Sequence, residues 1–456
     1  MSTAQGIAVT AVDAAAPATV STAVCSLTQR LAGQGAMLFT GYAAAQGFSF
    51  LRNALIGHGL AKGDFGIAAT ITLVLQLIET LSDLGTDRLI VQARDGDDDR
   101  FVATAHTTIF VRGMITAALL YLAAAPTARF FAIPDVAWAL QLAALVPLIK
   151  GFQHLDYRRA QRHYDNRPQL ILEVGPQAVA LAATLPLLAY SGGYAVALWL
   201  SLLQAVAAVV LSHLLAERPY RMAADRPILA RFVSFGWPIW LSAFPLVAVY
   251  QGDRIIIGRM LGMEELAAYS AAFMITMVPG LVAAKVGHAL MLPALGAARD
   301  DAATFARRFA RLTEATALAA ALYLALFLTV GGPILTLAFG AHYAGLGAVV
   351  GWLAVMWALR MLQAVPGMAL MALGATRPFL AAGLIRATSL ALSLAAATHG
   401  LGLAAIAAAG VLGEFGSLVY IAWRLDADRP GLMRAFLVRA LALVPAAALG
   451  LALAAR

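Results

Sequence analysis

Charged residues are scarce in this 456-residue sequence, and their scarcity excludes a soluble protein. Only 12% of the residues are charged, 61% are hydrophobic, and the mean hydropathy is +0.80. Soluble domains contain about 25% charged residues, so most of this chain must be solvated by lipid. The net charge of +8 comes from Lys and Arg spread between apolar runs. This pattern indicates membrane topology rather than a nucleic-acid surface, and we expect no nucleic-acid partner.

Cysteine is almost absent as well. Cys25 is the only one, which excludes a disulfide framework and a cysteine-based metal site. The acidic run 95–99 lacks the glutamate that ends a calcium-binding loop. His58, His342 and His399 show no ligand-like spacing. We therefore expect no metal and no cofactor.

Apolar runs of about 20 residues, the length that crosses a bilayer, recur along the chain. A final run, 435–455, is a candidate thirteenth span, although Arg434 and Arg439 lie at its start. The twelve other predicted spans lie near 31–53, 64–84, 103–125, 134–153, 169–190, 193–216, 232–252, 265–291, 312–338, 346–373, 378–398 and 401–423.

The basic residues are distributed unequally between alternate connections. The even-numbered connections and the segment after the twelfth span hold 21 Lys and Arg residues, against 5 in the odd-numbered connections. Under the positive-inside rule, this predicts a cytoplasmic amino terminus and cytoplasmic even connections. No connection is long enough to fold into a soluble domain, so the protein must function inside the membrane or through short loops.

The two halves of the chain resemble each other. A shift of 201 residues aligns Ile56 with Ile257, Gly57 with Gly258, Leu60 with Leu261, and Asp64 with Glu265. Six spans followed by six leave both halves entering from the same side, which predicts a parallel internal repeat. In such a fold the substrate lies between the two bundles, and rocking of one against the other alternates access.

Several basic residues fall inside or near the ends of predicted spans, where a charge is costly and suggests a function. One interpretation is that they line a cationic cavity between the halves, where Arg offers bidentate contacts to a phosphate-bearing or acidic substrate. The alternative is that they pair within a bundle or extend to an interface. The candidates for substrate binding are Arg52, Arg112, Arg254, Lys285, Arg360 and Arg386.

Three acidic residues are candidates for gating or ion coupling. Asp83 and Lys285 occupy equivalent positions in the repeat, near the cytoplasmic ends of their helices. They form either a substrate or gating pair or an ordinary interhelical ion pair. Glu79 and Glu314 are candidates for carrying a coupling proton, and the alternative for both is capping or ion pairing.

Four motifs resemble those of the polysaccharide-type flippases, which transport O-antigen and exopolysaccharide repeat units. These flippases belong to the multidrug/oligosaccharidyl-lipid/polysaccharide exporter superfamily. The stretch 252–262, running on to Tyr269-Ser270, resembles the signature of their seventh span. His58 stands where an Arg is common in that family. The other similar motifs are Leu81–Gly85, Gly331–Gly340 with Tyr343, and Gly374–Pro378, and the likeness covers roughly residues 28–425.

The resemblance implies a flippase for an undecaprenyl-diphosphate-linked oligosaccharide in the bacterial inner membrane. It implies two six-helix lobes in a V shape around a cationic central cavity, with ion-coupled transport and no enzymatic activity. The implied partners are this substrate, membrane lipid, and the polysaccharide polymerase with its chain-length machinery.

The predicted architecture is therefore an all-α, polytopic membrane protein. Residues 1–28 hold one Asp and no Lys or Arg, unlike the basic start of a signal peptide, and we expect a disordered cytoplasmic tail there. The lobes cover 29–216 and 232–424, joined by a basic cytoplasmic linker at 217–231 and followed by the segment 425–456.

Two other functions are compatible with such a fold. A drug or metabolite antiporter would need an aromatic, acidic pocket with few bases, and the bases in these spans argue against it. A polysaccharide polymerase or lipid-sugar glycosyltransferase would need a sizeable outer loop or an outward acidic motif. The outer loops are short, and the acidic run 95–99 is predicted to be cytoplasmic.

Overall fold

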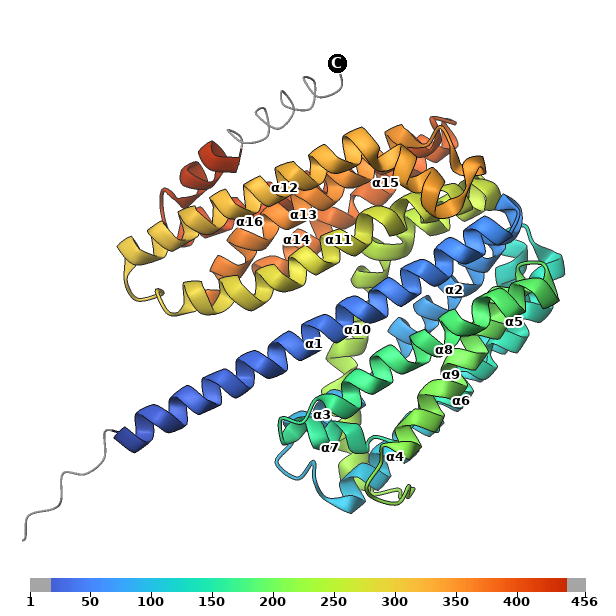
Figure 1. The fold of residues 1–456 in the computed structure, drawn as a ribbon, viewed down its shortest axis with the longest axis horizontal. Coiled ribbons are helices and arrows are strands. Elements are labelled where there is room, and N and C mark those ends of the chain that lie inside the picture. The colour runs from blue at the N-terminus through green and yellow to red at the C-terminus, as the bar shows by residue number, and fades with distance from the viewer. Residues whose placement is uncertain (1–17, 441–456) are drawn as a thin grey trace, which may run out of the picture.

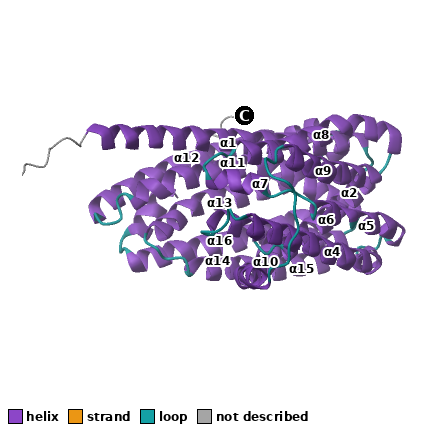
Figure 2. Ribbon diagram, turned by 90° about the horizontal axis from the view of Figure 1, so that it is seen from below, coloured by secondary structure: helices purple, strands orange, loops and turns teal. Residues whose placement is uncertain are grey.

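The computed structural model describes residues 18–440, and every regular element in that range is helical (Figure 2). The side chains at 18–36, 38, 283–286, 288 and 289 are outside this description. In the described part of the chain, ten helices are long and apolar enough to cross a membrane. Large apolar side chains such as Leu122 and Leu337 are 73% and 82% exposed. Such exposure suits a lipid environment, and the chain is a multi-pass membrane protein.

The first lobe precedes residue 215. Its fourth predicted span, 134–153, is present as two helices that are interrupted at Ala144. The elements of this lobe are α1 (Ala18–Gly59), α2 (Lys62–Ser82), α3 (Thr86–Gln92), α4 (Asp99–Phe130), η1 (Pro134–Val136), α5 (Ala137–Ala143), α6 (Leu145–Lys150), α7 (Asp156–Arg162), α8 (Arg167–Ser191) and α9 (Ala195–Leu214).

The second lobe begins within the next long helix. Its eleventh predicted span, 378–398, is likewise divided, at Thr388. Its elements are α10 (Arg226–Met260), α11 (Met263–Gly296), α12 (Ala302–Phe339), η2 (Ala341–Tyr343), α13 (Gly347–Ala372), α14 (Pro378–Ala387), α15 (Ser389–Thr398) and α16 (Gly402–Asp428).

The ends of the chain differ from the predicted boundaries. Helix α1 begins at Ala18, so residues 18–28 are helical rather than part of a disordered tail. Their many alanines favour a helix, since alanine has the highest helix propensity. The remainder of the predicted tail, 1–17, lies outside the described residues. Most of the candidate thirteenth span, 435–455, also lies outside them, although residues 432–440 are helical.

The two lobes meet at one end and diverge toward the other (Figure 1). A Cβ atom added at Gly57 of α1 would lie 2.5 Å from the ring of Phe339, which ends α12. At the equivalent Gly258 of α10, it would lie 3.0 Å from the ring of Phe131, which follows α4. Each lobe thus packs a glycine at an equivalent position against an aromatic residue of the other, which agrees with the predicted parallel repeat. We call this the closed end, and the opposite one the open end.

Aromatic and polar contacts seal the closed end. The ring of Phe65 lies 5.9 Å from that of Phe339 and 6.1 Å from that of Tyr343. The ring nitrogen Nδ1 of His58 donates to the carbonyl oxygen of Ala338 at 2.9 Å. Such contacts between α1, α2 and the end of α12 separate the space between the lobes from the membrane surface at this end.

Helix α10 belongs to both lobes. Near its start, the ring of Phe232 lies 5.1 Å from that of Phe101 in α4, and Arg231 pairs with Asp95 at 2.6 Å. Further along, its Gly252 lies against Leu390 of α15. The first lobe therefore holds the start of α10, and the contacts change lobes inside this helix rather than in the predicted linker.

We predict that Gly66→Ala destabilises the closed end. An added Cβ would lie 1.9 Å from the carbonyl oxygen of Met263, at the start of α11 in the other lobe. Overpacking of this kind costs about 1–3 kcal/mol, so the thermal unfolding midpoint of the purified protein should fall. Gly63→Ala on the same helix is the control, because nothing lies within 4 Å of its added Cβ. Equal midpoints for the two variants would contradict this account of the closure.

Candidate functional site

A polar cavity of about 500 Å³ lies between α2, α4 and α6 of the first lobe and α10. Lys150 Nζ lies 2.5 Å from Glu79 Oε1. Asp83 pairs with Arg88 at 3.1 Å and with Arg112 at 3.4 Å. These ionic side chains are all partly exposed. We call this space the outer cavity. Charged groups at membrane depth must face water or protein rather than lipid. Here Glu79 and Asp83 are paired with cations, and the paired side chains remain partly exposed to the cavity.

A second cavity, of about 300 Å³, lies among α1, α2, α6, α8 and α9, and all of its walls come from the first lobe. Arg52 donates to Gln204 Oε1 at 2.8 Å and to Gln177 Oε1 at 3.2 Å. Among the residues that the structure describes, no carboxylate lies within ion-pair distance of Arg52. We call this space the inner chamber. Glu79 and Lys150 line both cavities, so their ion pair lies between them.

The second lobe holds a buried ionic cluster. Arg360 of α13 and Arg386 of α14 contact Glu414 of α16 at 2.6 and 2.8 Å, and the Glu414 side chain is 1% exposed. The Arg360 guanidinium also lies over the rings of Tyr250 and Trp357. The space at this cluster is only about 20 Å³. In this conformation the cluster is closed to any phosphate or sugar.

Arg254 lies near that cluster and is also packed. Its guanidinium lies 4.4 Å from the centre of the Phe273 ring, and its Nη1 lies 3.4 Å from Gln251 Oε1. The neighbouring Asp253 accepts a hydrogen bond from the hydroxyl of Tyr269.

The candidate residues that the sequence predicted therefore lie at several separate sites in the structure. Arg52 lies in the inner chamber, whereas Arg112, Glu79 and Asp83 line the outer cavity. Arg360 and Arg386 lie in the buried cluster of the second lobe, with Arg254 nearby, rather than in one shared cavity. Glu314 is 55% exposed and pairs with Arg439. Lys285 is part of α11, and its side chain lies outside the description, so its suggested pairing with Asp83 remains a prediction.

The neutral polar residues of the inner chamber were not predicted from the sequence. Gln76, Gln177 and Gln204 come from three different helices and carry no charge, so the sequence did not mark them as a set. The available signal was the helical position of each glutamine inside a span, since amide groups there also need partners.

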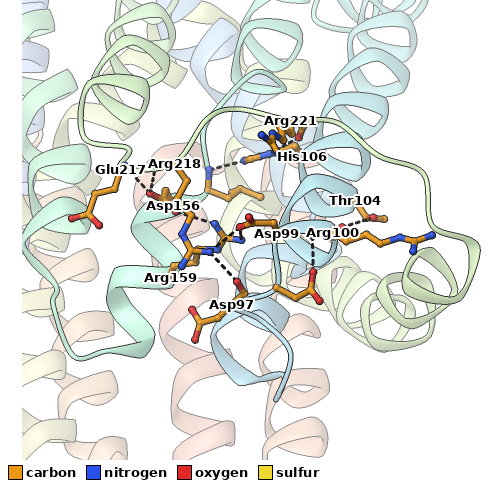
Figure 3. A network of polar contacts seen from close by, with 12 residues as sticks. Asp97, Asp99, Arg100, Thr104, His106, Asp156, Arg159, Glu217, Arg218 and Arg221 are labelled. Atoms are coloured by element: carbon orange, nitrogen blue, oxygen red, sulfur yellow. Dashed lines mark hydrogen bonds and ion pairs between the residues drawn. The ribbon is translucent and has the colours of Figure 1, made fainter.

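At the open end, a network of ion pairs fastens the linker to the first lobe (Figure 3). Asp99 accepts from both Arg159 and Arg218 at 2.8 Å. The Asp156 carboxylate accepts from the backbone N–H groups of Glu217 and Arg218 at 2.8 and 3.3 Å. The run 95–99 therefore supplies counter-charges for arginines of α7 and of the linker, which gives it a structural role.

His154 holds the same linker only in its neutral form. Its Nε2–H donates to the carbonyl oxygen of Arg218 at 3.0 Å, and its Nδ1 accepts from the N–H of Asp156 at 3.1 Å. Burial lowers the pKa of His154, and the nearby His213 and Arg159 lower it further, while Asp156 raises it. A second proton would sit on the nitrogen that accepts, so protonation removes one of these contacts.

Two lobes related by a parallel repeat, closed at one end and lined by polar cavities, define a membrane protein with the fold of the MOP superfamily. An inward-facing multidrug resistance transporter of the MATE family in that superfamily matches with a TM-score of 0.71 at 15% identity, over 85% of this chain and 96% of its own. The lipid II flippase MurJ, in its inward closed conformation, matches with a TM-score of 0.71 at 12% identity, over 90% and 92%. At these identities the likeness concerns the fold.

Sequence similarity defines the family more narrowly. Residues 60–348 match the family described as "Polysaccharide biosynthesis protein", and the chain belongs to that family. The succinoglycan biosynthesis transport protein ExoT of Rhizobium meliloti (strain 1021) is 23% identical over 318 residues, which cover 68% of this chain. The match spans 62% of that relative's length, less than two thirds of it.

We predict that Glu414→Gln is strongly destabilising, whereas Glu314→Gln is not. Removing the Glu414 charge leaves Arg360 and Arg386 buried without a counter-charge, which typically costs about 3–5 kcal/mol. The exposed pair of Glu314 with Arg439 is worth up to about 1 kcal/mol. Thermal unfolding of the two purified variants should separate them clearly. Similar midpoints would show that the buried cluster is not a stabilising ionic contact.

We predict that the unfolding midpoint falls as pH falls through the ordinary titration range of histidine, near about 6.5. The folded state lowers the pKa of His154, so below that range the unfolded chain binds a proton that the folded protein does not, and stability is lost. His154→Gln keeps a donor for the Arg218 carbonyl and should reduce this pH dependence. The exposed His399→Gln is the control, and an equal reduction in both variants would contradict a role for His154.

Proposed function

We propose that this protein is a flippase that moves an undecaprenyl-diphosphate-linked oligosaccharide from the cytoplasmic to the periplasmic leaflet of the bacterial inner membrane. The transported units would serve surface polysaccharide synthesis, of the O-antigen or exopolysaccharide kind. The observation that carries the proposal is the outer cavity, a polar space that holds Arg88, Arg112 and Lys150 between the first lobe and α10.

The orientation rests on charge. The connections at the open end are those with 21 Lys and Arg residues, so the open end would face the cytoplasm together with the amino terminus. The structure would then be an inward-facing state, with its closed end toward the periplasm. A lipid headgroup in the cytoplasmic leaflet could enter the space between the lobes while its chain stays in the lipid.

A diphosphate that enters the outer cavity would meet cations that already form ion pairs within the protein. Arg112 and Lys150 pair with Asp83 and Glu79, so a bound diphosphate would compete for cations held by carboxylates. A carboxylate that loses its paired cation in this way would bind a proton or another cation more strongly. We therefore propose Glu79 and Asp83 as the coupling or gating acids. Rocking of the lobes about the closed end would give alternating access.

The relatives support the transport of a lipid-linked saccharide. The relative from Rhizobium meliloti is named as a transport protein of succinoglycan biosynthesis, and one structural neighbour is named as a lipid II flippase. The polysaccharide polymerase and chain-length machinery remain proposed partners, downstream of the flipped unit.

We predict that cells lacking this protein accumulate complete but unpolymerised lipid-linked units on the cytoplasmic leaflet, and that the gene restores transport. Arg112→Ala and Lys150→Ala should fail to restore it at normal protein level, because each removes a cation from the outer cavity. Arg439→Ala, which changes only a surface pair, is the control and should restore it. The measurement is the leaflet location of the units, by labelling in intact and opened cells.

Other outcomes would contradict the proposal. Units that reach the outer leaflet and stay unpolymerised would favour a polymerase. No change in the units, together with a drug-resistance phenotype on expression, would favour an antiporter.

A further inference from the structure

We propose that the inner chamber is a carbohydrate-binding site, which receives the sugar part of the headgroup, with Arg52 binding an anionic group of that same headgroup. This inference rests on the proposed function for the identity of the headgroup. It adds a site in the first lobe that is separate from the cations of the outer cavity.

The polar groups of the chamber are better suited to hydrogen bonding with sugar hydroxyls than to binding a phosphate. Gln76, Gln177 and Gln204 face one space from three helices, α2, α8 and α9. A side-chain amide both donates and accepts hydrogen bonds, as a sugar hydroxyl does. Ile56 and Leu200 supply apolar wall for the C–H faces of a sugar ring.

The exposure of Gln76 indicates that the chamber is hydrated. Gln76 is exposed, although it lies inside the membrane-spanning helix α2. The hydroxyl of Thr72, which is also exposed, donates to the carbonyl oxygen of Ala68 in the same helix at 3.0 Å. An exposed side-chain amide inside a spanning helix must face an aqueous cavity, since lipid offers it no hydrogen bonds. The chamber is therefore accessible to a polar ligand in this state.

Among the side chains that the structure describes, Arg52 is the charged group of the chamber without a counter-ion. Its guanidinium is held by two neutral amide oxygens, from Gln177 and Gln204, which orient it and leave its charge uncompensated. The other cation in the wall, Lys150, is paired with Glu79. Arg52 would thus receive an anion, either a carboxylate on an acidic sugar or a phosphate of the lipid carrier.

The Lys150–Glu79 pair lies between this chamber and the outer cavity, because both residues line both spaces. A headgroup whose diphosphate occupies the outer cavity could extend its sugar past this pair into the inner chamber. The two spaces would then divide the recognition of one molecule.

The test uses two single-cysteine reporters in the purified full-length protein, after Cys25→Ser removes the native thiol. Ser201→Cys reports on the inner chamber, and Ser242→Cys reports on the outer cavity. The positions are matched, because each serine hydroxyl donates to a carbonyl of its own helix at 2.7 Å. The rate of maleimide alkylation is measured with cellobiose, cellobiouronic acid or inorganic pyrophosphate.

We expect the sugars to slow alkylation at Ser201→Cys and not at Ser242→Cys. Gln177→Leu should abolish this protection, and an unchanged reaction at the Ser242→Cys reporter verifies that the variant is folded. Arg52→Gln should weaken protection by the anionic probe about tenfold or more, and Arg52→Lys should weaken it less. Protection by cellobiouronic acid beyond that by cellobiose identifies a sugar carboxylate as the anion, and Arg52-dependent protection by pyrophosphate alongside cellobiose identifies a phosphate.

The inference is overturned if neither sugar slows alkylation at Ser201→Cys, or if both reporters are protected equally. This readout does not depend on transport. Missing protection in a protein that still flips lipid-linked units in cells would remove the chamber assignment and leave the proposed function intact.

Discussion

A polar side chain at membrane depth must be paired inside the protein or must face water, and this constraint organises the whole molecule. The second lobe meets it by pairing, with Glu414 fully enclosed between Arg360 and Arg386. The first lobe also pairs its ionic side chains, but these pairs and several amide side chains line two open cavities. Binding capacity in this state therefore resides in the first lobe and along α10.

The scaffold is nearly symmetric, whereas its chemistry is not. Gly57 and Gly258 occupy equivalent repeat positions and make equivalent contacts with an aromatic residue of the opposite lobe. Arg52 and Arg254 are also nearly equivalent in the repeat, yet they differ in their surroundings. Arg52 is held by two amides in an open chamber, while Arg254 lies on the Phe273 ring beside Asp253. The two halves of a duplicated fold can in this way keep equivalent contacts at the closed end while their polar sites differ.

Hydropathy was sufficient to predict the helical class and most of the spans, because lipid requires a long apolar helix at every crossing. The repeat was predicted from the likeness of the two halves in sequence. Neither hydropathy nor this likeness could place side chains around each helix. Arg360 and Arg386 were therefore predicted to bind substrate together with Arg112, although both form ion pairs with Glu414. The inner chamber was not predicted, because its glutamines are neutral and come from three different helices. The start of α1 at Ala18 was missed since hydropathy marks the span and not the helix that extends beyond it.

The central claim is that the protein itself moves a lipid-linked oligosaccharide between leaflets. Purified protein in liposomes carrying an undecaprenyl-diphosphate oligosaccharide tests it most directly, with a membrane-impermeant glycosidase acting on the outer leaflet alone. The account predicts that nearly all of the oligosaccharide becomes cleavable when the wild-type protein is present. It predicts that only the outer-leaflet fraction is cleaved with the Arg112→Ala protein. Cleavage that stops at the outer-leaflet fraction with the wild-type protein, in liposomes supplied with an ion gradient, would contradict the account.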